Sequence, residues 1–209
     1  MYDKIIAAVL SGDTEMAAAE AKLLTDNGVD PLQVIDQGLI VAMGEVGRLF
    51  KENEIFVPEV MMSAHTVTMV IEQLKPLLKE ERASLGTIII GTVKGDLHDI
   101  GKNLVALLLA NNGFKVIDLG NDVSPERFVS EAKANNCDII ALSALLTTTM
   151  INMDATIKAF NDADYRQQVK IIIGGAPVTA DYAVEINADG YSEDAASAVD
   201  LCKHLMQNQ

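Results

Sequence analysis

The stretch TIIIGTVKGDLHDIGKN, residues 87–103, decides the fold. It begins with an apolar run from Thr87 to Gly91, continues in a glycine-flanked loop that contains His98, and leads into an apolar segment at 102–111. An unbroken run of β-branched residues is typical of a strand that is covered on both faces. The stretch therefore predicts a buried strand, a loop and a helix, which together begin a parallel sheet.

The alternation of strand and helix continues along the rest of the chain. We expect further strands at 115–119, 138–143, 169–173 and 189–191, and helices at 102–111, 125–134, 150–160, 180–186 and 194–205. Five parallel strands with intervening helices suit the order 2-1-3-4-5 of a doubly wound, Rossmann-like (flavodoxin-like) α/β sheet. Ligands of such sheets bind at the carboxyl ends of strands one and three. The loop that holds His98 and the segment from Ser143 to Thr149 are predicted to meet there.

Residues 1–83 follow a helical period instead. Apolar side chains recur three and four positions apart, and the segments SGDT at 11–14, NGVDP at 27–31 and VPE at 57–59 are typical of helix ends and starts. We therefore predict a four-helix bundle at 1–83, a Rossmann-like domain at 84–209, and a hinge at 83–86.

The composition restricts the partners of the chain. Its 30 acidic and 16 basic residues give a formal net charge of −14 at pH 7. Such a charge argues against nucleic acid or an anionic membrane as a partner. No apolar run approaches the roughly 20 residues of a membrane-spanning helix, and we expect a cytoplasmic location. Cys137 and Cys202 show no disulfide or zinc pattern and are expected to be buried.

His98 lies in a loop where a phosphate site would carry other residues. The loop lacks the pattern of a phosphate cradle, and Asp96 and Asp99 would repel a phosphate. A zinc site would need more ligands, and His65 and His204 belong to other segments. A flavin site stays open, although flavin loops are usually richer in serine and threonine. A metal that brings most of its own ligands would need one imidazole, with Asp96 accepting its second N–H. On this motif alone, a structural histidine is an equal alternative.

Three motifs together resemble those of a known family. The segment Asp96-Leu97-His98-Asp99-Ile100-Gly101 has the form DxHxxG, 41 residues separate Gly101 from Ser143-Ala144-Leu145, and 28 residues separate Leu145 from Gly174-Gly175. With GEVGRLF at 44–50 and IFVPEV at 55–60, these motifs resemble the cobalamin-binding module and helical cap of methionine synthase and of the corrinoid proteins in methylamine, betaine and methanol methyltransferase systems. The resemblance covers nearly the whole chain.

The resemblance implies roles for the motif residues. His98 would bind cobalt from below in place of the cofactor's dimethylbenzimidazole base, Asp96 would accept the imidazole N–H, and Thr149, where the family has serine, would complete the relay. These three form the expected catalytic set. The other expected cofactor-binding residues are Gly95, Leu97, Asp99, Ile100, Gly101, Ser143, Leu145, Thr147, Gly174, Gly175, Phe56 and Met61.

Some of these residues have a more specific expected part. Ser143 and Thr147 would contact the displaced base, and the pair Gly174-Gly175 would admit the nucleotide tail. Phe56 with Met61 or Met62 would cover the upper face of the corrin, although core packing explains such residues equally well.

The resemblance implies a carrier that is not catalytic by itself. It would hold cobalamin base-off and His-on, and would shuttle a methyl group, as methyl-Co(III) alternating with Co(I), between a substrate methyltransferase and an acceptor methyltransferase that uses coenzyme M or tetrahydrofolate. A reductive activase is a further expected partner. The methyl donor cannot be read from the sequence.

Three alternatives are left open. The small subunit of an adenosylcobalamin mutase shares the DxHxxG module but usually lacks the helical cap. A cobalamin sensor would carry a basic DNA-binding domain. A flavodoxin-like or receiver-like domain would bind no corrinoid.

Overall fold

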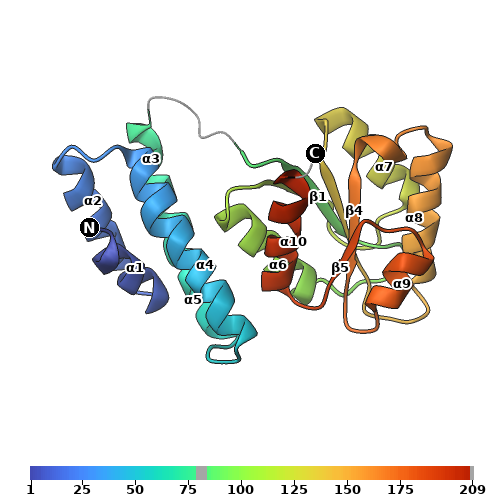
Figure 1. Cartoon of the computed structure of the whole chain (residues 1–209), viewed down its shortest axis with the longest axis horizontal. Coiled ribbons are helices and arrows are strands. Elements are labelled where there is room, and N and C mark those ends of the chain that lie inside the picture. Colours follow the sequence, from blue (N-terminus) through green and yellow to red (C-terminus); the bar gives the residue numbers. More distant parts are fainter. Residues whose placement is uncertain (79–83, 208–209) are drawn as a thin grey trace. The chain divides into compact units, whose positions relative to one another are not determined.

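The computed structural model describes residues 1–78 and 84–207, which divide into two compact units (Figure 1). The first unit is Met1–Ala83 with Asn111–Gly113, and the second is Ser84–Ala110 with Phe114–Gln209. No helix among the described residues is long and apolar enough to cross a bilayer.

The first unit is made of helices. They are α1 (Asp3–Leu10), α2 (Thr14–Asp26), α3 (Pro31–Val34), η1 (Ile35–Leu39), α4 (Ile40–Lys51), α5 (Val57–Leu74) and η2 (Lys75–Leu77). Two of the predicted helix starts have side-chain caps, because Asp13 accepts a hydrogen bond from the Met16 amide and Asp30 accepts one from the Leu32 amide, each at 2.9 Å. The third predicted helix differs, since α3, η1 and α4 form one run whose middle, η1, is a π-helix.

The second unit contains one parallel sheet. Its strands are β1 (Thr87–Thr92), β2 (Lys115–Asp118), β3 (Ile139–Ser143), β4 (Lys170–Gly174) and β5 (Gly190–Ser192), in the predicted order β2-β1-β3-β4-β5. The register pairs Thr92 with Ser143 and Ser143 with Gly174 at the carboxyl ends of three central strands. The segments that carry the sequence motifs therefore begin side by side.

Helices cover both faces of the sheet (Figure 1). They are α6 (Ile100–Asn111), α7 (Pro125–Asn135), α8 (Ile151–Asp162), α9 (Ala180–Glu185) and α10 (Ala195–Gln207), with the short η3 (Arg166–Gln168) before β4. Ile89 of β1 packs in one core cluster with Phe128 of α7 and Phe160 of α8, while its neighbours Ile88 and Ile90 are buried on the opposite face. This two-sided burial explains the unbroken isoleucine run.

Three smaller predictions can be compared with this structure. Cys137 and Cys202 are free and buried as expected, and burial raises the pKa of each thiol to about 12. The helix predicted to start at Lys102 begins two residues earlier, at Ile100. Of the predicted hinge, residue 83 lies outside the described residues, and residues 84–86 are tied to β2, since the Lys115 amide bonds to the Gly86 carbonyl at 3.0 Å and to Ser84 Oγ at 2.9 Å. Whether residues 84–86 act as a hinge stays a prediction.

Candidate functional site

Asp96 and His98 form a pair in the loop after β1. His98 Nδ1 lies 2.8 Å from Asp96 Oδ1, and the His98 backbone amide donates to the same oxygen at 3.1 Å. The contact is local, because residues two apart on an extended loop project to the same side. The hydrogen bond expected between these side chains is therefore present.

The other carboxylate oxygen of Asp96 joins this loop to the loop after β3. Asp96 Oδ2 accepts hydrogen bonds from Thr149 Oγ1 at 2.7 Å, from the Leu145 amide at 2.8 Å and from the Leu146 amide at 3.2 Å. Asp96 is completely buried and Thr149 is nearly so. The expected bond from Thr149 is made, and threonine replaces the family's serine without loss of this contact.

The charge of Asp96 decides which nitrogen of His98 carries a proton. Burial by itself would raise the pKa of this carboxyl, but the hydrogen bonds from Thr149, Leu145 and His98 together hold the pKa well below its usual range. An ionised carboxylate only accepts hydrogen bonds, so His98 Nδ1 must be the donor. The neutral ring then presents the lone pair of Nε2, which makes no hydrogen bond to the residues that the structure describes.

Exposed apolar residues lie on the same two segments as the histidine and its partner Asp96. The side chain of His98 is 51% exposed, and four exposed apolar residues flank it on the two segments that Asp96 joins. These residues, which we call the apolar rim, are Leu97, Ile100, Leu145 and Leu146, exposed by 69%, 82%, 44% and 41%. Several exposed apolar side chains on segments that also present one polar atom are typical of a binding surface for a large ligand.

Gly101 leaves space beside the same loop. A Cβ at this position would meet no other segment of the described residues within 4 Å, although alanine would suit the first turn of α6 better than glycine. The protein itself gives no steric reason for glycine here. An open surface without a side chain allows a ligand to approach the helix backbone closely.

Comparisons with known proteins agree with this geometry. Two family models, each described as a B12 binding domain, match residues 86–200 and residues 1–75. The chain belongs to the B12-binding protein family.

Relatives of this B12-binding protein match over nearly its whole length. It is 44% identical to the trimethylamine corrinoid protein 1 of Methanosarcina acetivorans, over 95% of this chain and 94% of the relative. Its structure resembles a chain of the methanol:cobalamin methyltransferase complex MtaBC from Methanosarcina barkeri, with a TM-score of 0.88, 31% identity, and coverage of 99% of this chain and 79% of that chain. It also resembles a cobalamin-binding protein from Desulfitobacterium hafniense DCB-2, with a TM-score of 0.85, 29% identity and 98% coverage of both chains.

The residues of the B12-binding protein fit its cofactor in two respects. His98 offers one nitrogen lone pair, which could replace the cofactor's own base as a ligand of cobalt, and the apolar rim would suit the apolar part of the macrocycle. Among the described residues, no three histidine, cysteine or acidic side chains lie where they could hold a bare metal ion.

The glycine pair has a second explanation in this B12-binding protein. A Cβ at Gly175 would lie 1.9 Å from the Ala144 carbonyl oxygen, and one at Gly174 would lie 3.1 Å from the Ser192 carbonyl oxygen. Backbone packing thus requires glycine at 175 whether or not a ligand is bound. That the glycine pair admits the nucleotide tail of the cofactor stays a prediction. Ser143 is half-buried and Thr147 is exposed, and their expected contacts with the displaced base of the cofactor also stay a prediction.

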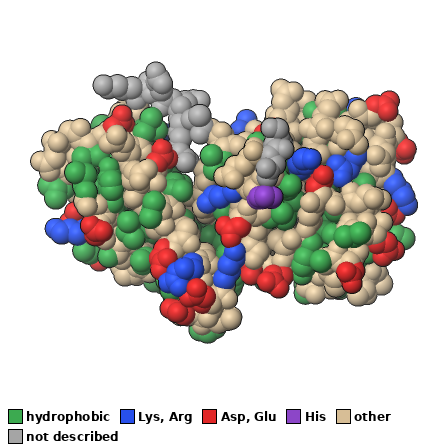
Figure 2. All heavy atoms as spheres, viewed as in Figure 1, with side chains coloured by type: hydrophobic (Ala, Val, Ile, Leu, Met, Phe, Trp, Pro, Cys, Tyr) green, Lys and Arg blue, Asp and Glu red, His purple; other side chains and the backbone are tan. Residues whose placement is uncertain are grey.

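The two residues expected above the corrin lie in the first unit of the B12-binding protein. Phe56 precedes α5 and is 63% exposed, and Met61 lies on α5 and is 54% exposed. Core packing, the alternative explanation, therefore does not account for either side chain. Figure 2 shows hydrophobic side chains at the surface of these N-terminal helices. Their contact with the cofactor stays a prediction.

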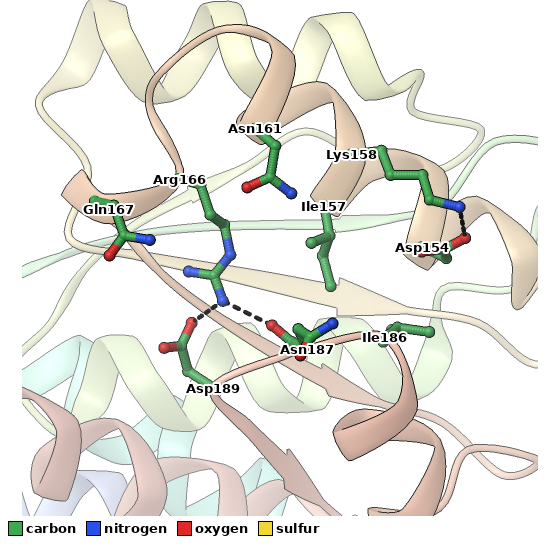
Figure 3. Close-up of a pocket in the computed structure, with 9 residues that line it drawn as sticks. All are labelled: Asp154, Ile157, Lys158, Asn161, Arg166, Gln167, Ile186, Asn187 and Asp189. Atoms are coloured by element: carbon green, nitrogen blue, oxygen red, sulfur yellow. Dashed lines mark hydrogen bonds and ion pairs between the residues drawn. The ribbon is translucent and has the colours of Figure 1, made fainter.

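A hollow of about 380 Å³ lies elsewhere in the second unit, between α8, η3 and the segment that joins α9 to β5 (Figure 3). Arg166 there donates to the Val169 and Asn187 carbonyl groups and pairs with Asp189 at 2.7 Å, while Lys158 pairs with Asp154. These charged groups are already bonded to one another. None of the expected cofactor residues lines this hollow, so it is separate from the His98 loop.

The sequence did not indicate several residues that hold the His98 loop. Thr92, Asn121, Asp122 and Asn152 all bond to its backbone. The one available signal was topological, because the order 2-1-3 places the loop after β2 beside the loop after β1.

Proposed function

We propose that this B12-binding protein is a methyl carrier of a corrinoid methyltransferase system. His98 Nε2 would bind the cobalt of cobalamin in place of the cofactor's own base. The observation that carries the proposal is the bond from His98 Nδ1 to buried Asp96, which orients the ring and leaves Nε2 to bind a metal.

The residues of the chain bind and orient, while the reaction takes place on the cofactor. When bound, the cobalt supplies the nucleophile that accepts a methyl group and the bond from which that group later leaves. Asp96 keeps the proton of the imidazole on Nδ1, and Thr149 and two backbone amides hold Asp96 in place. The apolar rim would exclude water from the bound macrocycle.

The partners follow from the same proposal. A substrate methyltransferase supplies the methyl group, and a second methyltransferase passes it to coenzyme M or tetrahydrofolate, with a reductive activase restoring the reduced cofactor. A methylated amine is favoured over methanol as the methyl donor, because this chain is 44% identical to a trimethylamine corrinoid protein and 31% identical to the chain from the methanol complex. The helical first unit also matches a B12-binding family model. This favours a methyl carrier over the small subunit of an adenosylcobalamin mutase, which usually lacks such a helical unit. We place the protein in the cytoplasm.

Binding of hydroxocobalamin tests the ligand. The purified protein should take up one equivalent and show the absorption spectrum of an imidazole-ligated, base-off corrinoid. The variant His98→Ala should lose that spectrum, and its affinity should fall about tenfold or more, whereas His204→Ala on α10 serves as the matched control and should behave as wild type. An imidazole-ligated spectrum in His98→Ala would refute the assignment.

A transfer assay tests the methyl carrier. The reduced, cobalamin-loaded protein is mixed in separate assays with the methyltransferase for mono-, di- or trimethylamine or for methanol, each together with its substrate. Methylation of the corrinoid is followed by absorbance. One amine enzyme should methylate it at a rate well above that of the methanol enzyme. A loaded protein that accepts a methyl group from none of them would overturn the proposal.

A further inference from the structure

Other segments donate hydrogen bonds to most of the backbone carbonyl groups in the loop that carries His98. The carbonyls of Lys94, Asp96, Leu97 and His98 accept hydrogen bonds from Asn152 Nδ2 at 2.7 Å, the Asp122 amide at 3.0 Å, Asn121 Nδ2 at 3.2 Å and Thr92 Oγ1 at 2.8 Å. The donors belong to α8, to the loop after β2 and to β1. A loop with so many bonded carbonyls is fixed by the protein and has few alternative conformations.

Thr92 acts on the metal-binding residue itself. It is the last residue of β1, it is completely buried, and its hydroxyl donates to the backbone carbonyl of His98. The bond connects the rigid sheet to the residue whose ring must point at the cobalt. Because Asp96 fixes the other end of the same residue through Nδ1, Thr92 and Asp96 together determine both its position and its direction.

Asp122 holds the residues just before His98. Its Oδ1 accepts the Gly95 amide at 2.7 Å, and its own amide donates to the Asp96 carbonyl at 3.0 Å. Asp122 has a φ of 52°, a left-handed conformation that aspartate and asparagine tolerate better than most residues. It is exposed, so these two bonds, not core packing, are its contribution to the fold.

We propose that Thr92 and Asp122 are positioning residues for cobalt ligation: they fix the His98 loop in its binding geometry before the cofactor arrives. The inference rests on the proposed function, because it assumes that His98 binds cobalt. A loop that is already ordered in the free protein loses little conformational entropy when the ligand binds. The binding free energy is therefore more favourable than for a loop that must become ordered. Loosening either contact should therefore reduce ligation by His98 more than it reduces folding.

Two pairs of variants distinguish the loss of a hydrogen bond from the effect of changing the side chain as such. Thr92→Val keeps the shape of the side chain but removes the hydroxyl, and Thr92→Ser, its control, keeps the hydroxyl. Asp122→Ala removes the acceptor for the Gly95 amide, and Asp122→Asn keeps an acceptor oxygen and tolerates the left-handed conformation. Far-ultraviolet circular dichroism and thermal unfolding show which variants fold. If Thr92→Val does not fold, the two variants of the exposed residue Asp122 test the positioning proposal by themselves.

Ligation is read from the cobalt. Each protein is labelled with 15N-histidine and loaded with cob(II)alamin, whose electron paramagnetic resonance lines are split into doublets by a 15N ligand and into triplets by the cofactor's own 14N base. Wild type, Thr92→Ser and Asp122→Asn should give doublets. Thr92→Val and Asp122→Ala should show a reduced doublet fraction and about tenfold weaker binding of cob(II)alamin.

Hydrogen exchange of the cofactor-free proteins supplies a second measurement. The Gly95 amide, bonded to Asp122 in the wild type, should exchange about tenfold faster in Asp122→Ala but not in Asp122→Asn. If the wild type itself gives no doublets, the proposed function fails. If the wild type gives doublets and the folded Thr92→Val and Asp122→Ala variants match their controls in doublet fraction and affinity, the positioning proposal alone is wrong.

Discussion

The hydroxyl of Thr149 has one hydrogen and two acceptors within reach. Its Oγ1 lies 2.7 Å from Asp96 Oδ2 and 2.8 Å from the Leu146 carbonyl oxygen. A carboxylate is the stronger acceptor, so the hydrogen points at Asp96. Thr149 therefore supplies one of three donors to a buried charge at Oδ2, and its loss leaves that charge less compensated.

This contact gives a prediction for Thr149→Val. The variant should lower the free energy of unfolding by about 1–2 kcal/mol, because a donor to a charged, buried group is lost. It should also weaken hydroxocobalamin binding by about tenfold, because Asp96 then holds His98 less firmly. Thr149→Ser keeps the hydroxyl and should stay close to wild type in binding. Chemical denaturation and calorimetric titration measure the two effects, and equal affinity of the valine and serine variants would contradict the prediction.

Residues close in sequence were easier to predict than residues brought together by loops. The pairing of Asp96 with His98 follows from their spacing, whereas the part of Thr149 was implied only by the resemblance of its loop to the family. Thr92, Asn121 and Asp122 could not be predicted as partners of the loop, because their contacts depend on its exact path and threonine, asparagine and aspartate are common at strand ends and turns.

At the level of elements, the period of the apolar residues was enough to predict the sheet and its order. Isoleucine runs buried on two faces and the alternation with helices leave few other topologies. The π-helix of η1 was not predicted, because its i to i+5 bonding leaves the apolar spacing of the flanking helices unchanged. The loops after β3 and β4 were placed correctly, but their backbone packing at Gly175 depends on ångström-scale distances that a sequence pattern does not contain.

The two kinds of motif glycine should respond oppositely to alanine. Gly175→Ala places a Cβ 1.9 Å from the Ala144 carbonyl oxygen at a φ of 127°, so we expect a loss of about 2–3 kcal/mol in unfolding free energy without any cofactor. Gly101→Ala, its control, enters open space and should stabilise the cofactor-free protein by up to about 1 kcal/mol while weakening cobalamin binding. Urea denaturation measures the change in unfolding free energy of each variant, and titration with hydroxocobalamin measures the change in binding. A neutral Gly175→Ala would show that the two loops can separate.

At the level of the whole molecule, each unit has a buried core of its own. Leu39, Val46 and Val67 are completely buried in the first unit, and the cluster around Phe128 and Phe160 fills one side of the sheet in the second. Units with separate cores can unfold separately, and a ligand stabilises each unit only as far as it contacts that unit. Hydrogen exchange of core amides in each unit therefore reports which of them the cofactor touches.

The expected place of Phe56 and Met61 above the corrin can be tested in this way. Hydroxocobalamin at about one hundred times its Kd should protect the second unit by about 2.7 kcal/mol, and should also slow exchange in α4 and α5 if these side chains cover the cofactor. The double variant Phe56→Ala, Met61→Ala should lose the protection of α4 and α5 and keep that of the sheet. Leu23→Ala, an equally exposed apolar position on α2, serves as the control and should change neither. Exchange in α4 and α5 that the cofactor leaves unchanged in the wild type would remove Phe56 and Met61 from the site, while the assignment of His98 would stand.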